Sequence, residues 1–157
     1  MEAGLTIRPA GPGDVESVAR LVERLKILNE ELDPHFKVVE NLRDVSLEYV
    51  RRTLEGEDAF ILVADLSGEV VGFIRVEIID RLFYKPRVKA LITDLYVIPK
   101  FRARRVGSLL VEKAAEEARR RGARIISAIF PASNGIAEDF YGRLGFKKLQ
   151  LELYREI

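Results

Sequence analysis

One segment in the second half of the sequence joins an apolar strand pattern, a basic loop and the start of a helix. Residues 91–110 have the sequence LITDLYVIPKFRARRVGSLL. The loop from Lys100 to Gly107 places four cations before a helix whose first backbone N–H groups have no intrahelical partners. These donors and the positive end of the helix dipole suit an anion. The segment therefore predicts a strand, a pyrophosphate site and a helix in direct succession.

The two common nucleotide-binding loops do not explain this segment. The sequence contains no GxxxxGK[ST] loop, and no GxGxxG opens a strand-helix-strand unit. A different phosphate-bearing ligand is needed.

The size and charge of the chain exclude several classes of protein. Its 157 residues predict a single domain, 1–157, that is long enough to bury a full core. The 26 Lys and Arg residues nearly balance the 25 Asp and Glu residues, so the net charge of +1 favours neither nucleic acid nor an acidic partner. Any basic patch is local.

The rare residue types narrow the chemistry further. The chain has no cysteine, which excludes disulfides, thiolate nucleophiles and Cys-based zinc sites, and its single histidine excludes a His-rich metal centre. We therefore expect no metal. The sequence has no apolar run of membrane-spanning length and no signal-type leader, so we expect no membrane contact and a cytoplasmic location.

Hydrophobic periodicity predicts alternating strands and helices. Strands are expected over residues 5–8, 59–65, 70–79, 88–98, 125–129 and 146–154, with a hairpin turn at Leu66-Ser-Gly-Glu69. Helices are expected from Asp14 to about Leu28, from about 44 to 54, from about 107 to 121, ending before Gly122, and from Asn134 to Leu144. Residues 29–41 are expected to form a loop or broken helix. The predicted order is β-α-α-β-β-β-α-β-α-β.

The basic loop resembles the coenzyme A loop of the GNAT-type N-acetyltransferases. The shared pattern is V-x-P-x-[FY]-R-x-[KR]-x-[VI]-G-S-L-L, which covers Val97 to Leu110 here. The family pattern [QR]-x-x-G-x-[GA] is matched by Arg102 and Gly107, but Arg105 stands where the first glycine is usual. An arginine there must either avoid positive φ or bear its cost. Its side chain could also add a phosphate contact.

The resemblance covers nearly the whole chain and implies a fold, a cofactor and a cofactor site. The fold would be α/β, a GNAT fold with a mixed sheet of about six to seven strands and helices on both faces. The cofactor would be acetyl-CoA, with its pantetheine arm beside Leu95, Tyr96 and Val97. Its pyrophosphate would lie at Arg102, Ala103, Arg104, Arg105, Val106, Gly107 and Ser108.

Two downstream residues match further family positions. Tyr141 lies in Phe-Tyr-Gly-Arg-Leu-Gly-Phe, similar to the family's F-Y-x-[KR]-x-G-F, whose tyrosine often protonates the departing thiolate. Its structural alternative is a core residue with a bonded hydroxyl. Asn134 matches a family asparagine that commonly contacts the cofactor, and it could also cap the last helix.

The general base has several candidates. Asp94 in Thr-Asp-Leu-Tyr matches an acidic position of the family on a strand that borders the cleft, and its alternative is a buried structural aspartate. Glu77 and a water-mediated route are rivals. The single histidine, His35, follows Pro34 in a loop and is expected to be a surface residue.

Two charged clusters lie outside these motifs. The acidic loop of Glu30, Glu31, Asp33 and Glu40 could recruit a cationic acceptor, but a solvated face is the favoured interpretation. The basic cluster of Arg119, Arg120, Arg121 and Arg124 falls at a helix C-terminus, where it complements the helix dipole.

The sequence thus favours an acetyl-CoA-dependent N-acetyltransferase in which an amine attacks the thioester directly. The acceptor would be a small-molecule amine or a protein amine. The alternative is a binding module, either a catalytically silent coenzyme A sensor or a nucleic-acid binder using the basic loop, although only Phe101 lies among the loop cations. Homodimers are common in the family, so a homodimer is one expected state, but the sequence marks no interface.

Overall fold

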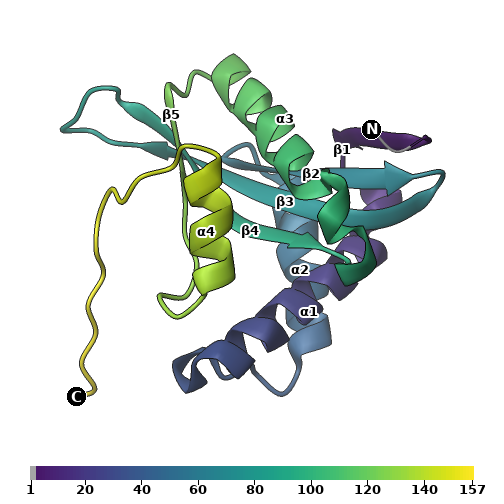
Figure 1. Cartoon of the computed structure of the whole chain (residues 1–157), viewed down its shortest axis with the longest axis horizontal. Helices are drawn as coiled ribbons and strands as arrows, with labels where there is room; N and C mark the ends of the chain where they lie inside the picture. The colour runs from purple at the N-terminus through teal and green to yellow at the C-terminus, as the bar shows by residue number, and fades with distance from the viewer. Residues whose placement is uncertain (1–2) are drawn as a thin grey trace.

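A single mixed sheet organises the protein in a computed structural model that describes residues 3–157 (Figure 1). Its five strands lie in the order β1-β2-β3-β4-β5. They are β1 (Leu5–Pro9), β2 (Ala59–Leu66), β3 (Glu69–Asp80), β4 (Val88–Val97) and β5 (Ile125–Ala128). Neighbouring strands are antiparallel from β1 to β4, and β5 runs parallel to β4.

Four helices cover the two faces of the sheet. They are α1 (Val15–Leu32), α2 (Leu42–Glu55), α3 (Val106–Arg120) and α4 (Gly135–Arg143). The first two lie on one face, and α3 and α4 lie on the other (Figure 1). Short 3₁₀ turns are η1 (Pro12–Asp14), η2 (Pro34–Phe36) and η3 (Pro99–Arg104). No helix in residues 3–157 has the length and apolarity needed to cross a membrane.

Period-two alternation in the central strands builds a core on each face. Along β2, Ile61 and Val63 pack with α1 and α2, whereas Phe60 and Leu62 pack with α3. Successive strand residues point to opposite faces, so an uninterrupted apolar run serves both cores at once. The sheet is therefore a fixed central layer from which the site residues project.

Most of the predicted elements are confirmed, with shifted boundaries. The first helix continues to Leu32, and η2 follows within the stretch expected to be a loop or broken helix. The predicted hairpin turn is present, with φ of 51° at Ser67 and 93° at Gly68. Both values are positive, as tight hairpin turns of matching twist require.

The predicted last strand is wrong, and the sheet has five strands rather than six to seven. Residues 147–157 form no helix or strand. Their alternating pattern suits a strand, but a strand also needs a neighbour with which to pair. After Gly145 the chain leaves α4 and runs away from β5, so this pairing is not made (Figure 1).

Candidate active site

The strands β4 and β5 are paired over only the first half of β4. Residues 89–92 pair with 125–128, and the Ile129 N–H donates to the Ile92 carbonyl at 3.1 Å. Residues 93–97 keep β3 on one side and, within residues 3–157, have no strand on the other. Alternate residues of such a segment direct N–H and C=O groups toward the open side. The predicted pantetheine segment, 95–97, lies in this unpaired half.

The basic loop after β4 adopts the backbone conformation of the glycine that Arg105 replaces. Arg105 has φ of 62° and ψ of 10°, which is the left-handed region. The sequence left open whether an arginine here avoids a positive φ or adopts it at an energetic cost. In the structure Arg105 adopts the positive φ. The substitution has therefore not removed the left-handed turn before α3.

The first turn of α3 presents unbonded backbone N–H groups. The Leu109 N–H donates to the Arg105 carbonyl at 3.0 Å, and the Ser108 Oγ donates to the same oxygen at 3.0 Å. The N–H groups of 106–108 have no backbone acceptor in the described part of the chain. Together with the helix dipole they form an anion site. A Cβ on Gly107 would lie 3.4 Å from the Phe140 ring, so this glycine lets α3 begin close beside α4.

The cations of the loop also have structural contacts. Arg102 donates through Nε to the Val97 carbonyl at 2.8 Å, and its guanidinium carbon lies 5.1 Å from the centre of the Tyr96 ring. The guanidinium of Arg104 lies 5.3 Å from the centre of the buried Phe101 ring. Arg102 thus fastens the loop to β4. Its contact with a pyrophosphate stays a prediction.

Tyr141 lies in α4 within a buried aromatic group. Its ring centre lies 5.6, 5.0 and 5.1 Å from those of Phe130, Phe140 and Phe146. Only 7% of the residue is exposed, yet its hydroxyl has no hydrogen bond within residues 3–157. Burial, and then the negative charge of Asp94, raise the pKa of the Tyr141 phenol, so it stays protonated. A hydroxyl without a protein partner is free to donate to a ligand.

Asn134 caps α4, as the structural alternative predicted. Its side-chain oxygen accepts from the Ala137 N–H at 3.0 Å. This bond uses one of the two acceptor positions of the oxygen and leaves the amide NH₂ as a donor. Capping and cofactor contact are therefore compatible, and the cofactor contact stays a prediction.

Asp94 is the centre of a buried polar cluster on the α1–α2 face of the sheet. Its side chain is 0% exposed, and it accepts from Lys26 Nζ at 2.6 Å, Tyr49 Oη at 2.5 Å and Thr93 Oγ1 at 2.8 Å. Thr93 is the extra residue of a β-bulge, since Arg75 pairs with Asp94 and Val76 pairs with Ile92. Bulges of this kind redirect neighbouring side chains.

The cluster continues onto β3 through Arg75. The guanidinium carbon lies 4.3 Å from the centre of the Tyr49 ring, and Arg75 donates to Thr93 at 3.0 Å and to Glu77 at 2.7 Å. Glu77, the rival base, is therefore tied to a cation. Burial, followed by the charge of Asp94, raises the pKa of the Tyr49 phenol, so this hydroxyl too stays protonated.

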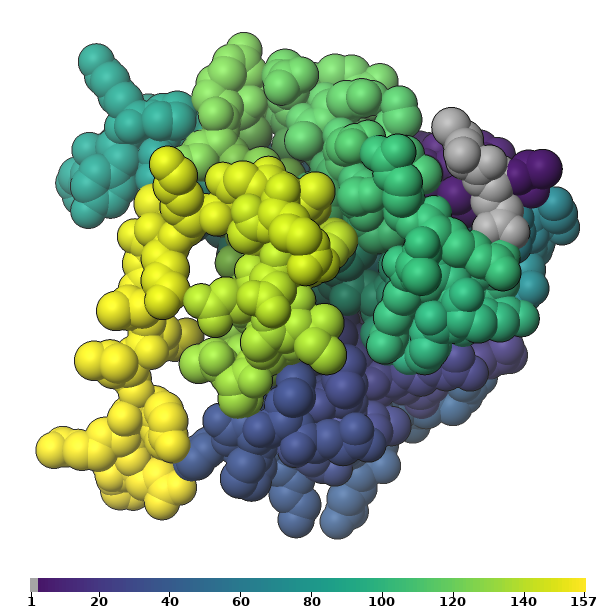
Figure 2. Space-filling view, viewed as in Figure 1, coloured from purple at the N-terminus to yellow at the C-terminus, as the bar shows by residue number. Residues whose placement is uncertain are grey.

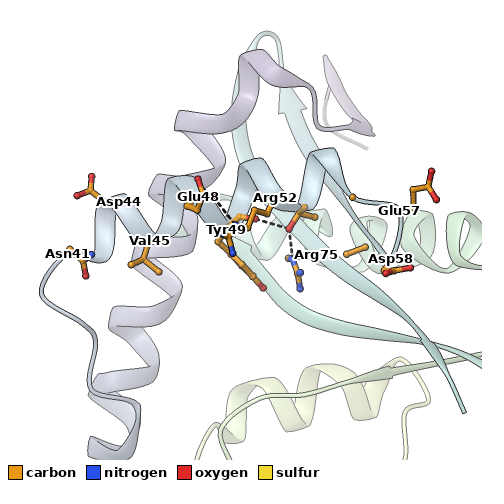
Figure 3. Close-up of a pocket in the computed structure, with 12 residues that line it drawn as sticks. Asn41, Asp44, Val45, Glu48, Tyr49, Arg52, Glu57, Asp58 and Arg75 are labelled. Carbon is orange, nitrogen blue, oxygen red and sulfur yellow. Dashed lines mark hydrogen bonds and ion pairs between the residues drawn. The ribbon is translucent and has the colours of Figure 1, made fainter.

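A hollow of about 700 Å³ opens beside this cluster, along α2 (Figure 3). Tyr49 and Arg75 form its inner wall, and Arg75 points in from the sheet. Its rim carries more acidic than basic side chains: Asp44, Glu48, Glu57 and Asp58 against Arg52. The Glu48 carboxylate is paired with Arg52 at 2.7 Å. The hollow therefore offers a site with local negative charge next to Asp94.

The acidic residues predicted to form a loop are divided between α1, which contains Glu30 and Glu31, and the segment after it, which contains Asp33 and Glu40. Glu30 accepts from the Val38 N–H at 2.7 Å, and Asp33 accepts from the backbone N–H of His35 at 2.9 Å. His35 is exposed, as predicted for a surface histidine, and its ring bonds to Asp33 and Glu156. These two carboxylates raise its pKa. The loop lies outside the buried cluster.

The basic cluster at the end of α3 makes contacts within its own chain, and Arg121 reaches the Glu57 carbonyl at 3.5 Å and the Phe60 ring centre at 4.7 Å. Arg120 and Arg121 each pair with Glu117, at 2.9 and 2.8 Å. Arg124 donates to the carbonyls of Arg119 and Ala123 at 3.4 and 2.9 Å. These contacts satisfy a helix C-terminus, as the sequence predicted.

Comparison with known proteins decides the family. A model described as the acetyltransferase (GNAT) family matches residues 25–146. The chain belongs to this family. The suspected GNAT relationship, the α/β GNAT-like fold and the N-acetyltransferase class are thereby confirmed.

Named relatives of this acetyltransferase come from archaea and bacteria. An uncharacterized N-acetyltransferase of Methanocaldococcus jannaschii is 36% identical over 95 residues, which span 60% of this chain and 42% of that protein. The chain thus aligns with less than half the length of this relative. Aminoalkylphosphonate N-acetyltransferase of Salmonella typhimurium is 30% identical over 145 residues, spanning 90% of this chain and 84% of that protein.

A solved structure shares the fold of this acetyltransferase. Aminoglycoside N-acetyltransferase AAC(6′)-Iy, solved in complex with CoA, matches with a TM-score of 0.78 at 19% identity, covering 99% of this chain and 97% of that one. At this identity the match shows the fold. An aminoglycoside acetyltransferase, meta-AAC0020, solved in complex with sisomicin, shares the fold with a TM-score of 0.73 at 18% identity, covering 98% of this chain and 97% of that one.

Sequence reasoning missed Lys26, Tyr49 and Arg75 as neighbours of Asp94. Lys26 and Tyr49 lie 68 and 45 positions from Asp94 along the chain. A lysine and a tyrosine inside amphipathic helices carry no local signal of a buried partner, because such side chains also suit a solvated face. Only the packing of α1 and α2 on β4 brings them together.

Proposed function

We propose that this acetyltransferase binds acetyl-CoA and transfers its acetyl group to a primary amine that attacks the thioester directly. The observation that carries the proposal is the open side of β4 with two sets of donors near it. One set is the N–H groups of 106–108, behind the left-handed Arg105. The other is the hydroxyl of Tyr141, which packs in the same core as Val97 and has no hydrogen-bond partner in residues 3–157.

The residues fit this cofactor by their chemistry. The three N–H groups at 106–108 suit the pyrophosphate, with Ser108 and the loop arginines beside them. The unpaired backbone of Leu95, Tyr96 and Val97 suits the amide groups of the pantetheine arm. Acetyl-CoA would supply the activated acyl group. A backbone N–H of this β4 segment would stabilise charge on the reacting oxygen.

Tyr141 is proposed as the acid for the thiolate. The raised pKa keeps the phenol protonated at neutral pH, so the proton is present when the thiolate departs. The rings of Phe130, Phe140 and Phe146 hold the tyrosine ring in place.

Asp94 is proposed to act through its neighbours on the acceptor side. Its carboxylate is enclosed by three donors, and of these Tyr49 also lines the hollow. Asp94 would therefore hold Tyr49 against the acceptor amine, and the amine proton would leave through water. The acidic rim of the hollow favours a cationic acceptor, which accords with the aminoglycoside named for one of the matched structures.

The test is coenzyme A release from acetyl-CoA with a panel of small amines, amino acids and protein amines. Tyr141→Phe should lower kcat by about 10²–10⁴-fold while acetyl-CoA still binds. Tyr84→Phe is the matched control, because it removes the hydroxyl of a tyrosine on an exposed hairpin. If Tyr141→Phe kept full activity, the acid would be another group. Acetyl-CoA binding without transfer to any amine would favour the silent sensor.

A further inference from the structure

Arg75 is a buried cation whose guanidinium is only partly used by the protein. The residue is 9% exposed, and it projects from β3 into the hollow along α2 (Figure 3). Its Nε donates to Thr53 Oγ1 at 2.8 Å, and its Nη1 donates to Glu77 at 2.7 Å and to Thr93 at 3.0 Å. A guanidinium has five N–H donors, so these bonds use three of them. The two N–H groups of Nη2 have no acceptor within residues 3–157.

The orientation of these two free donors is set by their surroundings. The Arg75 guanidinium stacks on the Tyr49 ring, with 4.3 Å between its central carbon and the ring centre, and its other two nitrogens are hydrogen-bonded. A planar guanidinium held in this way is preorganised for an oxyanion. Buried charged donors are costly to leave without an acceptor. An oxyanion of a ligand in the hollow would supply that acceptor.

The other charges of the hollow narrow the kind of ligand that fits. Glu77 pairs with Arg75, but its side chain is 40% exposed, whereas that of Arg75 is 10% exposed. The rim acids Asp44, Glu57 and Asp58 are exposed. Water and salt screen exposed charges, so the rim acts only weakly on a group bound at the inner wall. The inner wall therefore suits an anion and the rim suits a cation, which together describe a zwitterion.

The geometry points to an amine acceptor that carries a carboxylate or phosphate group near its reacting amine, with this oxyanion bound to Nη2 of Arg75. The inference rests on the proposed function and narrows its acceptor. Arg75 pairs with Asp94 across the β3–β4 ladder, so the anion would lie one strand away from β4. In this role Arg75 selects the acceptor and takes no part in the acetyl transfer itself.

The two substrates would reach β4 from different sides. The hollow opens along α2, on the face of the sheet that carries α1 and α2. Figure 2 shows a recess between α4 (yellow-green) and the start of α3 (green), where the proposed cofactor would enter. An amine held in the hollow and a thioester on the open side of β4 would then meet without either leaving its site, as direct attack requires.

The first test uses the parent chain, acetyl-CoA and acceptors that differ in the anionic group. Arginine is compared with argininamide, alanine with alaninamide, and O-phosphoethanolamine with ethanolamine. The value of kcat/KM should be about 10–100-fold higher for the anionic member, the range expected for charge-assisted hydrogen bonds to one group. A preference in the amino acid pairs alone assigns a carboxylate, and one in the third pair alone assigns a phosphate.

Two results of this test would overturn the inference. Equal kcat/KM within all three pairs would do so and leave the proposed function intact. Transfer to other amines but to none of these six would have the same meaning. Transfer to no amine at all would overturn the proposed function together with the inference.

The second test assigns the preference to Arg75. Arg75→Met should bring the kcat/KM ratio within each pair close to one, mainly through a higher KM for the anionic member. A purely structural role would lower both members equally and keep the ratio. Arg75→Lys retains the buried charge, so it tests the same ratio if the Met variant fails to fold. Arg87→Met, which removes an exposed arginine paired with Asp80, is the matched control and should keep the ratio. A ratio that persists in a folded Arg75 variant would overturn the assignment.

Discussion

At the scale of single residues, the most informative departure from expectation is Arg105. The family pattern favours glycine at this position, and the structure shows why, since the backbone there is left-handed. The turn into α3 requires only the left-handed backbone conformation at this position. The effect of the Arg105 side chain on stability and its effect on cofactor binding can therefore be measured separately.

Arg105→Gly should stabilise the fold. A left-handed L-residue costs about 1–2 kcal/mol, whereas glycine loses about 0.5–1 kcal/mol more in chain entropy, so a net gain of up to about 1 kcal/mol is expected. Urea unfolding of the parent and of Arg105→Gly measures this gain in the free energy of unfolding. Arg104→Gly is the matched control and should destabilise, because Arg104 has no positive φ. A weaker Kd for acetyl-CoA in Arg105→Gly would show that the side chain contacts phosphate, and an unchanged stability would contradict the strain.

The two buried tyrosines predict a loss of stability at high pH. Burial raises the phenol pKa of Tyr49 and Tyr141 in the folded protein. When the pKa of a group is higher in the folded than in the unfolded protein, its contribution to the free energy of unfolding is constant below the unfolded pKa, here about 10. As the pH rises above that value, the contribution falls by up to about 1.4 kcal/mol per pH unit for each group. Urea unfolding between neutral pH and about pH 11 measures this slope. Tyr141→Phe should flatten it, and a slope equal to that of the parent would refute the burial effect.

At the scale of secondary-structure elements, the Asp94 cluster links two helices to one strand of the sheet. Lys26 comes from α1, Tyr49 from α2 and Asp94 from β4. A buried carboxylate is tolerated only when its acceptor positions are used, so the cluster fixes how both helices sit on the sheet.

Tyr49→Phe should lower the free energy of unfolding by about 1.5–3 kcal/mol, because it removes a hydrogen bond to a charged acceptor inside the protein. In an Asp94→Asn background the same change should cost less. This double-mutant cycle, followed by urea unfolding, measures the coupling between the two side chains. Additive effects would mean that the 2.5 Å contact contributes nothing.

The same elements show how far sequence reasoning reaches. The hairpin at Ser67 and Gly68 and the end of α3 before Gly122 (φ 94°) follow from local chemistry, and both are confirmed. The last strand was predicted from an equally good pattern and is absent, because a strand depends on a partner that local sequence does not specify. The Asp94 cluster was unpredictable for the same reason. Its partners are brought together by tertiary packing alone.

At the scale of the whole molecule, β4 holds the two halves of the protein together. It carries Asp94 on the α1–α2 face, and its open edge faces β5 and α4. In its unpaired half β4 has a strand neighbour on one side only within residues 3–157, and α4 packs beside it through Tyr141, which belongs to the same core as Val97. A ligand that bonds to residues 95–97 would therefore stiffen the molecule where the ladder is interrupted.

Acetyl-CoA should accordingly raise the Tm and slow hydrogen exchange at the backbone of 95–97 and at the start of α3. At 100 times Kd, binding adds about 2.7 kcal/mol, which corresponds to roughly 5–10 °C for a chain of this size. Pantetheine, which lacks the pyrophosphate, should protect the β4 segment but leave the N–H groups of 106–108 exchanging freely. Hydrogen exchange measured by mass spectrometry distinguishes the protection given by acetyl-CoA from that given by pantetheine. Protection confined to the acidic hollow along α2 would place the cofactor on the other face and refute the assignment.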